Sequence, residues 1–214
     1  MKIGVFDSGI GGEAIAASLQ LTFPNADIKT VNDQSNVPYG DKDAEQIFKL
    51  TETAIQPLLN NSYDVIVIAC NSATAAAIEP LRQKYPDQKF IGIEPMVKTA
   101  ASHTKTNVIA VCATPATLAS ERYKGLVNNY ASHLTILEPD CSNWAYMIEH
   151  NDVNKQEIAN TINEVCGHGA DVIVLGCTHY HWIKDRIKRL AGKDVLVLEP
   201  SEAIGRRVSE LLGL

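Results

Sequence analysis

Residues 64–70 read DVIVIAC and residues 171–177 read DVIVLGC, and these two stretches decide the fold. Each is a run of aliphatic residues ending in a cysteine, which is typical of a strand buried on both faces of a parallel sheet. A second pair, IGVFDS at 3–8 and IAVCAT at 109–114, has an offset of 106 residues (3 to 109), against 107 (64 to 171) for the first. Two matched pairs at nearly one offset predict two similar half-domains, unless buried strands simply look alike.

The rest of the chain alternates between short apolar runs and longer amphipathic stretches, which predicts an α/β fold with mainly parallel sheets. The predicted strands lie near 3–6, 28–31, 65–69, 90–93, 108–111, 134–137, 172–176 and 195–198. The predicted helices lie at 41–60, 72–85, 115–130, 155–168, 181–191 and 201–213. No low-complexity linker separates the halves, so we expect the crossover just after GIEP, near 94–98.

Composition narrows the classes of protein to consider. The 214 residues carry a formal charge of −6 without a basic run, so nucleic acid is not an expected partner. No apolar run approaches the roughly 20 residues of a membrane span, and we expect a soluble protein without an export signal. Five cysteines without CxxC spacing support neither a disulfide framework nor a metal site, which favours reduced thiols in the cytoplasm. Cys112 and Cys166 are expected to be small core residues.

Four loops follow predicted strands at the end of the sheet where α/β proteins bind ligands. They are DSGIGG at 7–12, ACNSATA at 69–75, CATPAT at 112–117 and GCTHY at 176–180. If the two half-domains face each other across a central cleft, Cys70 and Cys177 approach one ligand from opposite sides. The hydroxyl and amide groups of these loops suit a small polar zwitterion.

The first loop also fits a dinucleotide fingerprint, because Gly9, Gly11 and Ala14 follow a strand and Asp27 or Asp33 lies about 20 residues further on. Asp7, however, would place a carboxylate beside the pyrophosphate, and a nicotinamide enzyme would leave both strand-end cysteines without a role. The same glycines allow backbone amides to hold a small carboxylate instead.

Two opposed thiols suggest inversion of a stereocentre, which needs proton removal on one face and delivery on the other. A thiol has a pKa of about 8.5, so neighbours must make one thiolate and leave one thiol. His179 beside Cys177, and Asp7 near Cys70, are the candidates. A purely structural role for His179 is the alternative.

At these residues the chain resembles the aspartate/glutamate racemase family. The resemblance rests on IGVFDSGIGG, PYG at 38–40, ACNSATAAA, GIEP, GCTHY and the closing helix, and it covers nearly the whole chain. It implies two pseudo-symmetric domains, 1–97 with 199–214 and 98–198. It also implies a cofactor-independent racemase that interconverts L- and D-glutamate for peptidoglycan, an isomerase that is usually a homodimer. Some relatives bind DNA gyrase.

Matched residue by residue, the resemblance implies that Cys70 acts on D-glutamate and Cys177 on L-glutamate. Asp7, His179 and Glu149 match the family's assisting residues. The positions that match substrate-binding ones are Asp7, Ser8, Pro38, Tyr39, Gly40, Asn71, Ser72, Thr117, Thr178 and His179.

The sequence departs from the family pattern in several places. VNDQSNVPYG replaces the usual segment before PYG, Ser72 replaces threonine, and SNWAYMIEHND surrounds Glu149. His181 and Trp182 follow GCTHY where proline and an aliphatic residue are usual. Two alternatives therefore stay open: a racemase of aspartate or another small acidic amino acid, and a non-catalytic protein that binds a partner through the segments around Trp144 and Trp182.

Overall fold

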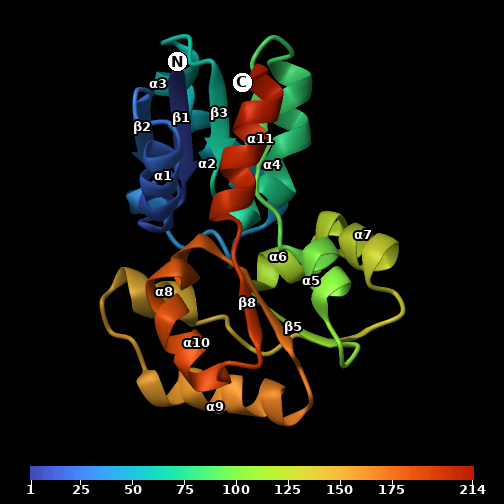
Figure 1. Ribbon diagram of the computed structural model, residues 1–214. Helices are drawn as coiled ribbons and strands as arrows, with labels where there is room; N and C mark the ends of the chain where they lie inside the picture. The colour runs from blue at the N-terminus through green and yellow to red at the C-terminus, as the bar shows by residue number, and fades with distance from the viewer. The chain divides into compact units, whose positions relative to one another are not determined.

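The computed structural model describes all 214 residues, which divide into two compact units (Figure 1). Unit 1 comprises Met1–Glu94 and Pro200–Leu214, and unit 2 comprises Pro95–Glu199. The limits expected from the sequence, 1–97 with 199–214 and 98–198, differ from these by three residues at the first crossing and by one at the second. Unit 2 is thus an insertion within unit 1.

Unit 1 is built on a sheet of four parallel strands in the order β2-β1-β3-β4. The strands are β1 (Lys2–Asp7), β2 (Asp27–Asn32), β3 (Val65–Ile68) and β4 (Phe90–Gly92). The helices are α1 (Gly11–Thr22), α2 (Ala44–Ala54), α3 (Gln56–Leu59), α4 (Asn71–Lys84) and α11 (Ser201–Leu212), with a 3₁₀ turn η1 (Gln34–Asn36).

Unit 2 repeats this plan with the strand order β6-β5-β7-β8, again all parallel. Its strands are β5 (Val108–Ala113), β6 (Thr135–Leu137), β7 (Val172–Gly176) and β8 (Leu196–Leu198). Its helices are α5 (Val97–His103), α6 (Pro115–Ala119), α7 (Glu121–Tyr130), α8 (Trp144–Glu149), α9 (Lys155–Gly167) and α10 (Lys184–Ala191), with a 3₁₀ helix η2 (Thr178–Ile183).

The two sheets correspond in strand register and also in strand order. Ile3 pairs with Val65 in unit 1, and Ile109 pairs with Val172 in unit 2, at the offsets read from the sequence. The predicted α/β fold with two similar halves is therefore confirmed, and all eight predicted strands are present.

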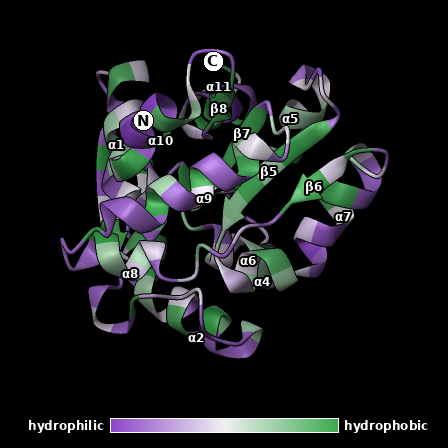
Figure 2. Ribbon diagram, turned by 90° about the horizontal axis from the view of Figure 1, so that it is seen from below, coloured by the Kyte–Doolittle hydropathy of each residue, from purple (hydrophilic) through white to green (hydrophobic).

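Each sheet is buried on both faces, as its apolar strands require. In β1, Ile3 and Val5 join a buried cluster that includes Ile204 and Val208 of α11. The alternate residue Gly4 faces the other side, where a Cβ would lie 2.9 Å from a methyl carbon of Leu58 in α3. In unit 2, Figure 2 shows β5 and β7 as largely apolar strands, and the colours of α9 alternate as expected for an amphipathic helix.

The sequence missed three helices, α1, α5 and α8. It also predicted single helices at 41–60 and 115–130, where the structure has two consecutive helices each, α2 with α3 and α6 with α7. The segment 181–191 begins inside η2 and only then becomes α10. Cys112 is fully buried as expected, but Cys166 on α9 is only half-buried, so the prediction of a core cysteine holds for Cys112 alone. None of the helices is both long and apolar enough to cross a membrane.

Candidate active site

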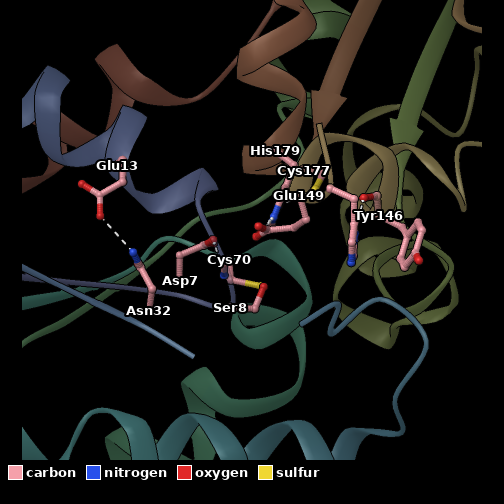
Figure 3. Close-up of polar contacts among 11 residues, drawn as sticks. Asp7, Ser8, Glu13, Asn32, Cys70, Tyr146, Glu149, Cys177 and His179 are labelled. Carbon is pink, nitrogen blue, oxygen red and sulfur yellow. Dashed lines mark hydrogen bonds and ion pairs between the residues drawn. The ribbon is translucent and has the colours of Figure 1, made fainter. Parts of the chain in front are cut away.

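The thiol of Cys70 lies at the carboxyl end of unit 1's sheet, where the chain leaves β3 and enters α4. Its Sγ accepts the N–H of Ala73 at 3.4 Å, which makes Cys70 the N-cap of α4. The Ser8 hydroxyl lies 3.5 Å from the same sulfur (Figure 3). Backbone N–H groups at a helix N-terminus favour negative charge, so this position stabilises a thiolate.

Asp7 ends β1 and is fully buried. Its Oδ2 accepts the N–H of Gly9 at 2.9 Å, so the loop that follows holds the carboxylate through its backbone. A Cβ at Gly12 would lie 2.6 Å from the Cβ of Asp7. Glycine at position 12 thus allows the start of α1 to pack directly on Asp7, and a larger residue would not fit there.

The PYG segment follows a cis peptide bond between Val37 and Pro38, and it buries both Tyr39 and Gly40. The Tyr39 hydroxyl donates to Oδ2 of Asp33 at 2.6 Å. Burial, followed by the bond to Asp33, raises the pKa of Tyr39, so the phenol stays protonated throughout the neutral range. Asp33, which the sequence offered only for a dinucleotide fingerprint, thus holds the tyrosine of the PYG segment.

Asn71 and Ser72 are the first two residues of α4, and both are buried. Neither Oδ1 nor Nδ2 of Asn71 has a hydrogen-bond partner within the protein. A buried amide without partners costs about 1–3 kcal/mol per unmet group, so such groups in native proteins call for an explanation. A polar ligand at the end of β3 would supply one.

The thiol of Cys177 lies at the carboxyl end of unit 2's sheet, directly after β7. Its Sγ is 3.7 Å from Nδ1 of His179, and Nε2 of His179 is 2.8 Å from Oε1 of Glu149 (Figure 3). The side chains of His179 and Glu149 are 3% and 2% exposed. Because a carboxylate only accepts, Nε2 carries a proton and Nδ1 faces the sulfur. A thiol, an imidazole and a carboxylate in series can move a proton to and from sulfur.

Two threonines complete this end of unit 2. Thr117 in α6 is buried, with its Oγ1 3.0 Å from Oγ1 of Thr114, the N-cap of that helix. Thr178 is buried as the first residue of η2. Since Ala113 pairs with Gly176, the loops after β5 and β7 leave neighbouring strands at the same end of the sheet.

Two residues that depart from the family pattern, His181 and Trp182, lie in η2, directly after GCTHY. His181 is half-buried, and burial, with a smaller effect of Lys184, lowers its pKa below the usual 6.5. Trp182 is 52% exposed and meets the His181 ring edge to face at 5.9 Å. Trp144 is completely buried, so it is not a surface for a partner.

In each unit, therefore, the residues singled out from the sequence gather at the carboxyl end of that unit's sheet. In unit 1 these are Asp7, Ser8, Pro38, Tyr39, Gly40, Cys70, Asn71 and Ser72. In unit 2 these are Thr117, Glu149, Cys177, Thr178 and His179. Thr114 was not singled out from the sequence, and Asp33 was considered only as the acidic residue of a dinucleotide fingerprint, because hydrogen bonds such as theirs leave no spacing pattern.

Comparison with known proteins places the chain in a family. The profile of the Asp/Glu/Hydantoin racemase family matches residues 14–207. A glutamate racemase of Herpetosiphon aurantiacus is 36% identical over 214 residues, covering 98% of this chain and 84% of the relative.

Among solved structures, a glutamate racemase isoform of Bacillus anthracis has a TM-score of 0.86 at 27% identity and covers 99% of this chain and 81% of its own. A glutamate racemase of Francisella tularensis, solved with D-glutamate, has a TM-score of 0.81 at 30% identity. The match covers 99% of this chain and 81% of that structure's chain.

Proposed function

Because this chain belongs to the Asp/Glu/Hydantoin racemase family, we propose that it interconverts L- and D-glutamate by moving the α-proton between two thiols. The observation that carries this proposal is the placement of Cys70 and Cys177 at equivalent strand ends of the repeat. In the cell the product D-glutamate supplies peptidoglycan synthesis.

The proposed reaction uses one thiolate and one thiol in each direction. The thiolate of Cys177 removes the α-proton of L-glutamate, and the thiol of Cys70 delivers a proton to the opposite face of the carbon. The reverse reaction starts on D-glutamate with Cys70 as the base. Inversion therefore leaves the two sulfurs with their protonation states exchanged, and solvent exchange resets them.

The neighbouring groups have distinct proposed roles. His179, backed by Glu149, moves a proton to and from Cys177, because its Nδ1 faces the sulfur at 3.7 Å and its Nε2 is bound to a carboxylate. Asp7 assists on the side of Cys70, where the Ala73 N–H already favours the thiolate.

The remaining proposed residues hold the substrate's ammonium and carboxylate groups. The unpaired amide of Asn71 is the best supported of them, because its donor and acceptor are both buried without partners. The others are Ser8, Pro38, Tyr39, Gly40, Ser72, Thr117, Thr178 and His179, together with Asp7. Tyr39 binds as a neutral phenol, since burial keeps it protonated.

The proposal also covers where and in what form the protein works. None of the five cysteines forms a disulfide bond, which suits the reducing cytoplasm. We propose a homodimer, as the family resemblance implies, and sedimentation velocity tests this assembly directly.

The test of the reaction is proton NMR of the purified protein with L-glutamate in deuterated water, without pyridoxal phosphate. Racemisation by deprotonation and reprotonation predicts loss of the α-proton signal together with appearance of D-glutamate. A full α-proton signal after long incubation rejects the proposal. The same tube with L-aspartate, and the ratio of specificity constants, distinguishes a glutamate racemase from a racemase of aspartate.

A further inference from the structure

Tyr180 is the last residue of the GCTHY motif, and the proposed mechanism gives it no part. It directly follows His179 and is completely buried. Its backbone N–H donates to the carbonyl of Cys177 at 3.1 Å, which closes the turn that carries Cys177 and His179. Its hydroxyl donates to the carbonyl of Cys141 at 3.0 Å. Tyr180 thus connects the turn that carries Cys177 to the segment around Cys141, which is distant in sequence.

The Cys141 carbonyl is a junction between two elements. Besides the Tyr180 hydroxyl it accepts the backbone N–H of Trp144 at 3.1 Å, and Trp144 is the first residue of α8. Glu149 is the last residue of this short helix. A displacement at the start of α8 is therefore carried to the carboxylate that His179 binds.

Packing reinforces the same junction. The Trp144 and Tyr180 rings meet edge to face with centroids 5.2 Å apart, and both side chains are completely buried. Trp144 Nε1 has no hydrogen-bond partner, so the indole contributes through ring contact alone. The turn of Cys177 and His179 is consequently tied to α8 at two points: Tyr180 at the start of the helix and His179 at its end.

We propose that Tyr180 is a positioning residue that holds Glu149 against His179 by bonding the Cys141 carbonyl. The inference rests on the proposed function, because the His179–Glu149 contact matters for catalysis only if His179 serves Cys177. Without the hydroxyl, the start of α8 loses its bond to η2, and the 2.8 Å contact between Nε2 and Oε1 lengthens. A shift of this kind near reacting groups has a large effect on rate.

The first experiment compares Tyr180→Phe with Tyr123→Phe. Tyr123 is a matched control, because it is also buried in unit 2 and its hydroxyl also donates to one oxygen, Oε1 of Glu138 at 2.6 Å. We expect kcat of Tyr180→Phe to fall by about 10- to 100-fold with KM nearly unchanged, and that of Tyr123→Phe to stay within about 2-fold. Equal effects of the two substitutions overturn the proposal.

A double-mutant cycle then asks whether Tyr180 acts through Glu149. If it does, Tyr180→Phe has less than about a 3-fold further effect in a Glu149→Gln background, because the contact it maintains is already lost. If the fold-decreases in kcat of the two single variants multiply in the double variant, Tyr180 acts independently of Glu149, and the proposal is overturned.

The deciding measurement needs no turnover. Proton NMR of the His179 ring, assigned by loss of its signal in His179→Gln, reports the Nε2–H bonded to Glu149. We expect this resonance unchanged in Tyr123→Phe and shifted or lost in Tyr180→Phe. Trp144→Leu, which loosens the junction by packing and keeps the hydroxyl, should move it in the same direction.

These outcomes separate the two proposals. A wild-type His179 resonance in both Tyr180→Phe and Trp144→Leu overturns the positioning role, even if glutamate is racemised. A protein that does not exchange the α-proton of glutamate, but whose His179 resonance depends on Tyr180, retains the positioning role and loses the proposed function.

Discussion

Cys70 and Cys177 occupy the same place in the two halves of the repeat, yet their sulfur atoms meet different chemical groups. Cys70 caps α4 and meets the Ala73 N–H and the Ser8 hydroxyl. Cys177 has no such cap hydrogen bond and faces the imidazole of His179 instead. At the position of His179, unit 1 has Ser72, and at the position of Asp7, unit 2 has Ala113. The backbone repeat places each thiol, and side chains that differ between the two halves give each thiol its chemistry.

The largest expected effect tests whether both thiols are needed. Cys70→Ala and Cys177→Ala should each lower racemisation by at least about 10³-fold, because one face of the α-carbon then has no acid or base. Turnover measured by circular dichroism, with far-ultraviolet spectra to verify folding, checks this result. A single variant at near wild-type rate would break the symmetry between the halves.

The second test removes the assisting group that only unit 2 has. His179→Asn should lower kcat by about 10²–10⁴-fold, because proton transfer to Cys177 loses its partner. Ser8→Ala, which removes the neutral hydroxyl beside Cys70, should cost only about 2- to 12-fold, as expected for one ordinary hydrogen bond.

Steady-state rates of these two variants compare the halves directly. If His179→Asn leaves the rate intact and lowers only the melting temperature, the histidine is structural.

The third test concerns how precisely unit 1 must hold the carboxylate of Asp7. In Gly12→Ala the new methyl group would lie 2.6 Å from the Cβ of Asp7, so Asp7 must move. We expect kcat to fall by about 10- to 100-fold, as for other small displacements beside reacting groups. Gly125→Ala is the control, because a Cβ there meets nothing within 4 Å. Equal activity of the two variants would show that Asp7 needs no exact placement.

The smallest effect concerns the groups buried near Cys177. A hydrogen bond to Cys112, together with burial, raises the pKa of Cys141, and burial raises that of Tyr180. Both stay neutral in the folded protein, while the unfolded chain loses their protons from about pH 9 upward. Their contribution to stability is therefore complete below that pH and is lost as pH rises, by up to about 1.4 kcal/mol per pH unit for each group.

Urea unfolding between pH 8 and pH 10.5 measures this dependence. The free energy of unfolding should fall less steeply with pH in Cys141→Ala than in the wild type. Identical slopes would show that Cys141 does not keep its proton in the folded protein.

The fold could be predicted from the sequence because the strands are buried on both faces and therefore appear as continuous apolar runs. These runs recur at nearly one offset, which shows the repeat. The sequence missed α1, since this helix starts with Gly11 and Gly12 and its alanine-rich stretch gives little apolar periodicity. It missed α8 because six residues are too few to show a helical period.

For the candidate site, the strand-end cysteines and the adjacent His179 could be identified from their positions alone. Glu149 lies 30 residues from His179, and only the family resemblance suggested it. Tyr180 was visible in its motif, but its partner is a backbone carbonyl, and a carbonyl leaves no signature in the choice of side chain at position 141. Contacts of this kind depend on the folded backbone and cannot be predicted from residue types.

The division of unit 1 into two separate stretches of chain has a consequence for biosynthesis. Ile204 and Val208 of α11 complete the apolar cluster around β1 and β3, but about a hundred residues of unit 2 are translated before them. On the ribosome, the amino-terminal segment therefore has one face of its sheet covered only in part, by Ile15 and Leu19 of α1, while the inserted unit emerges whole and can fold first. The nascent protein therefore depends on α11 to complete the packing of unit 1.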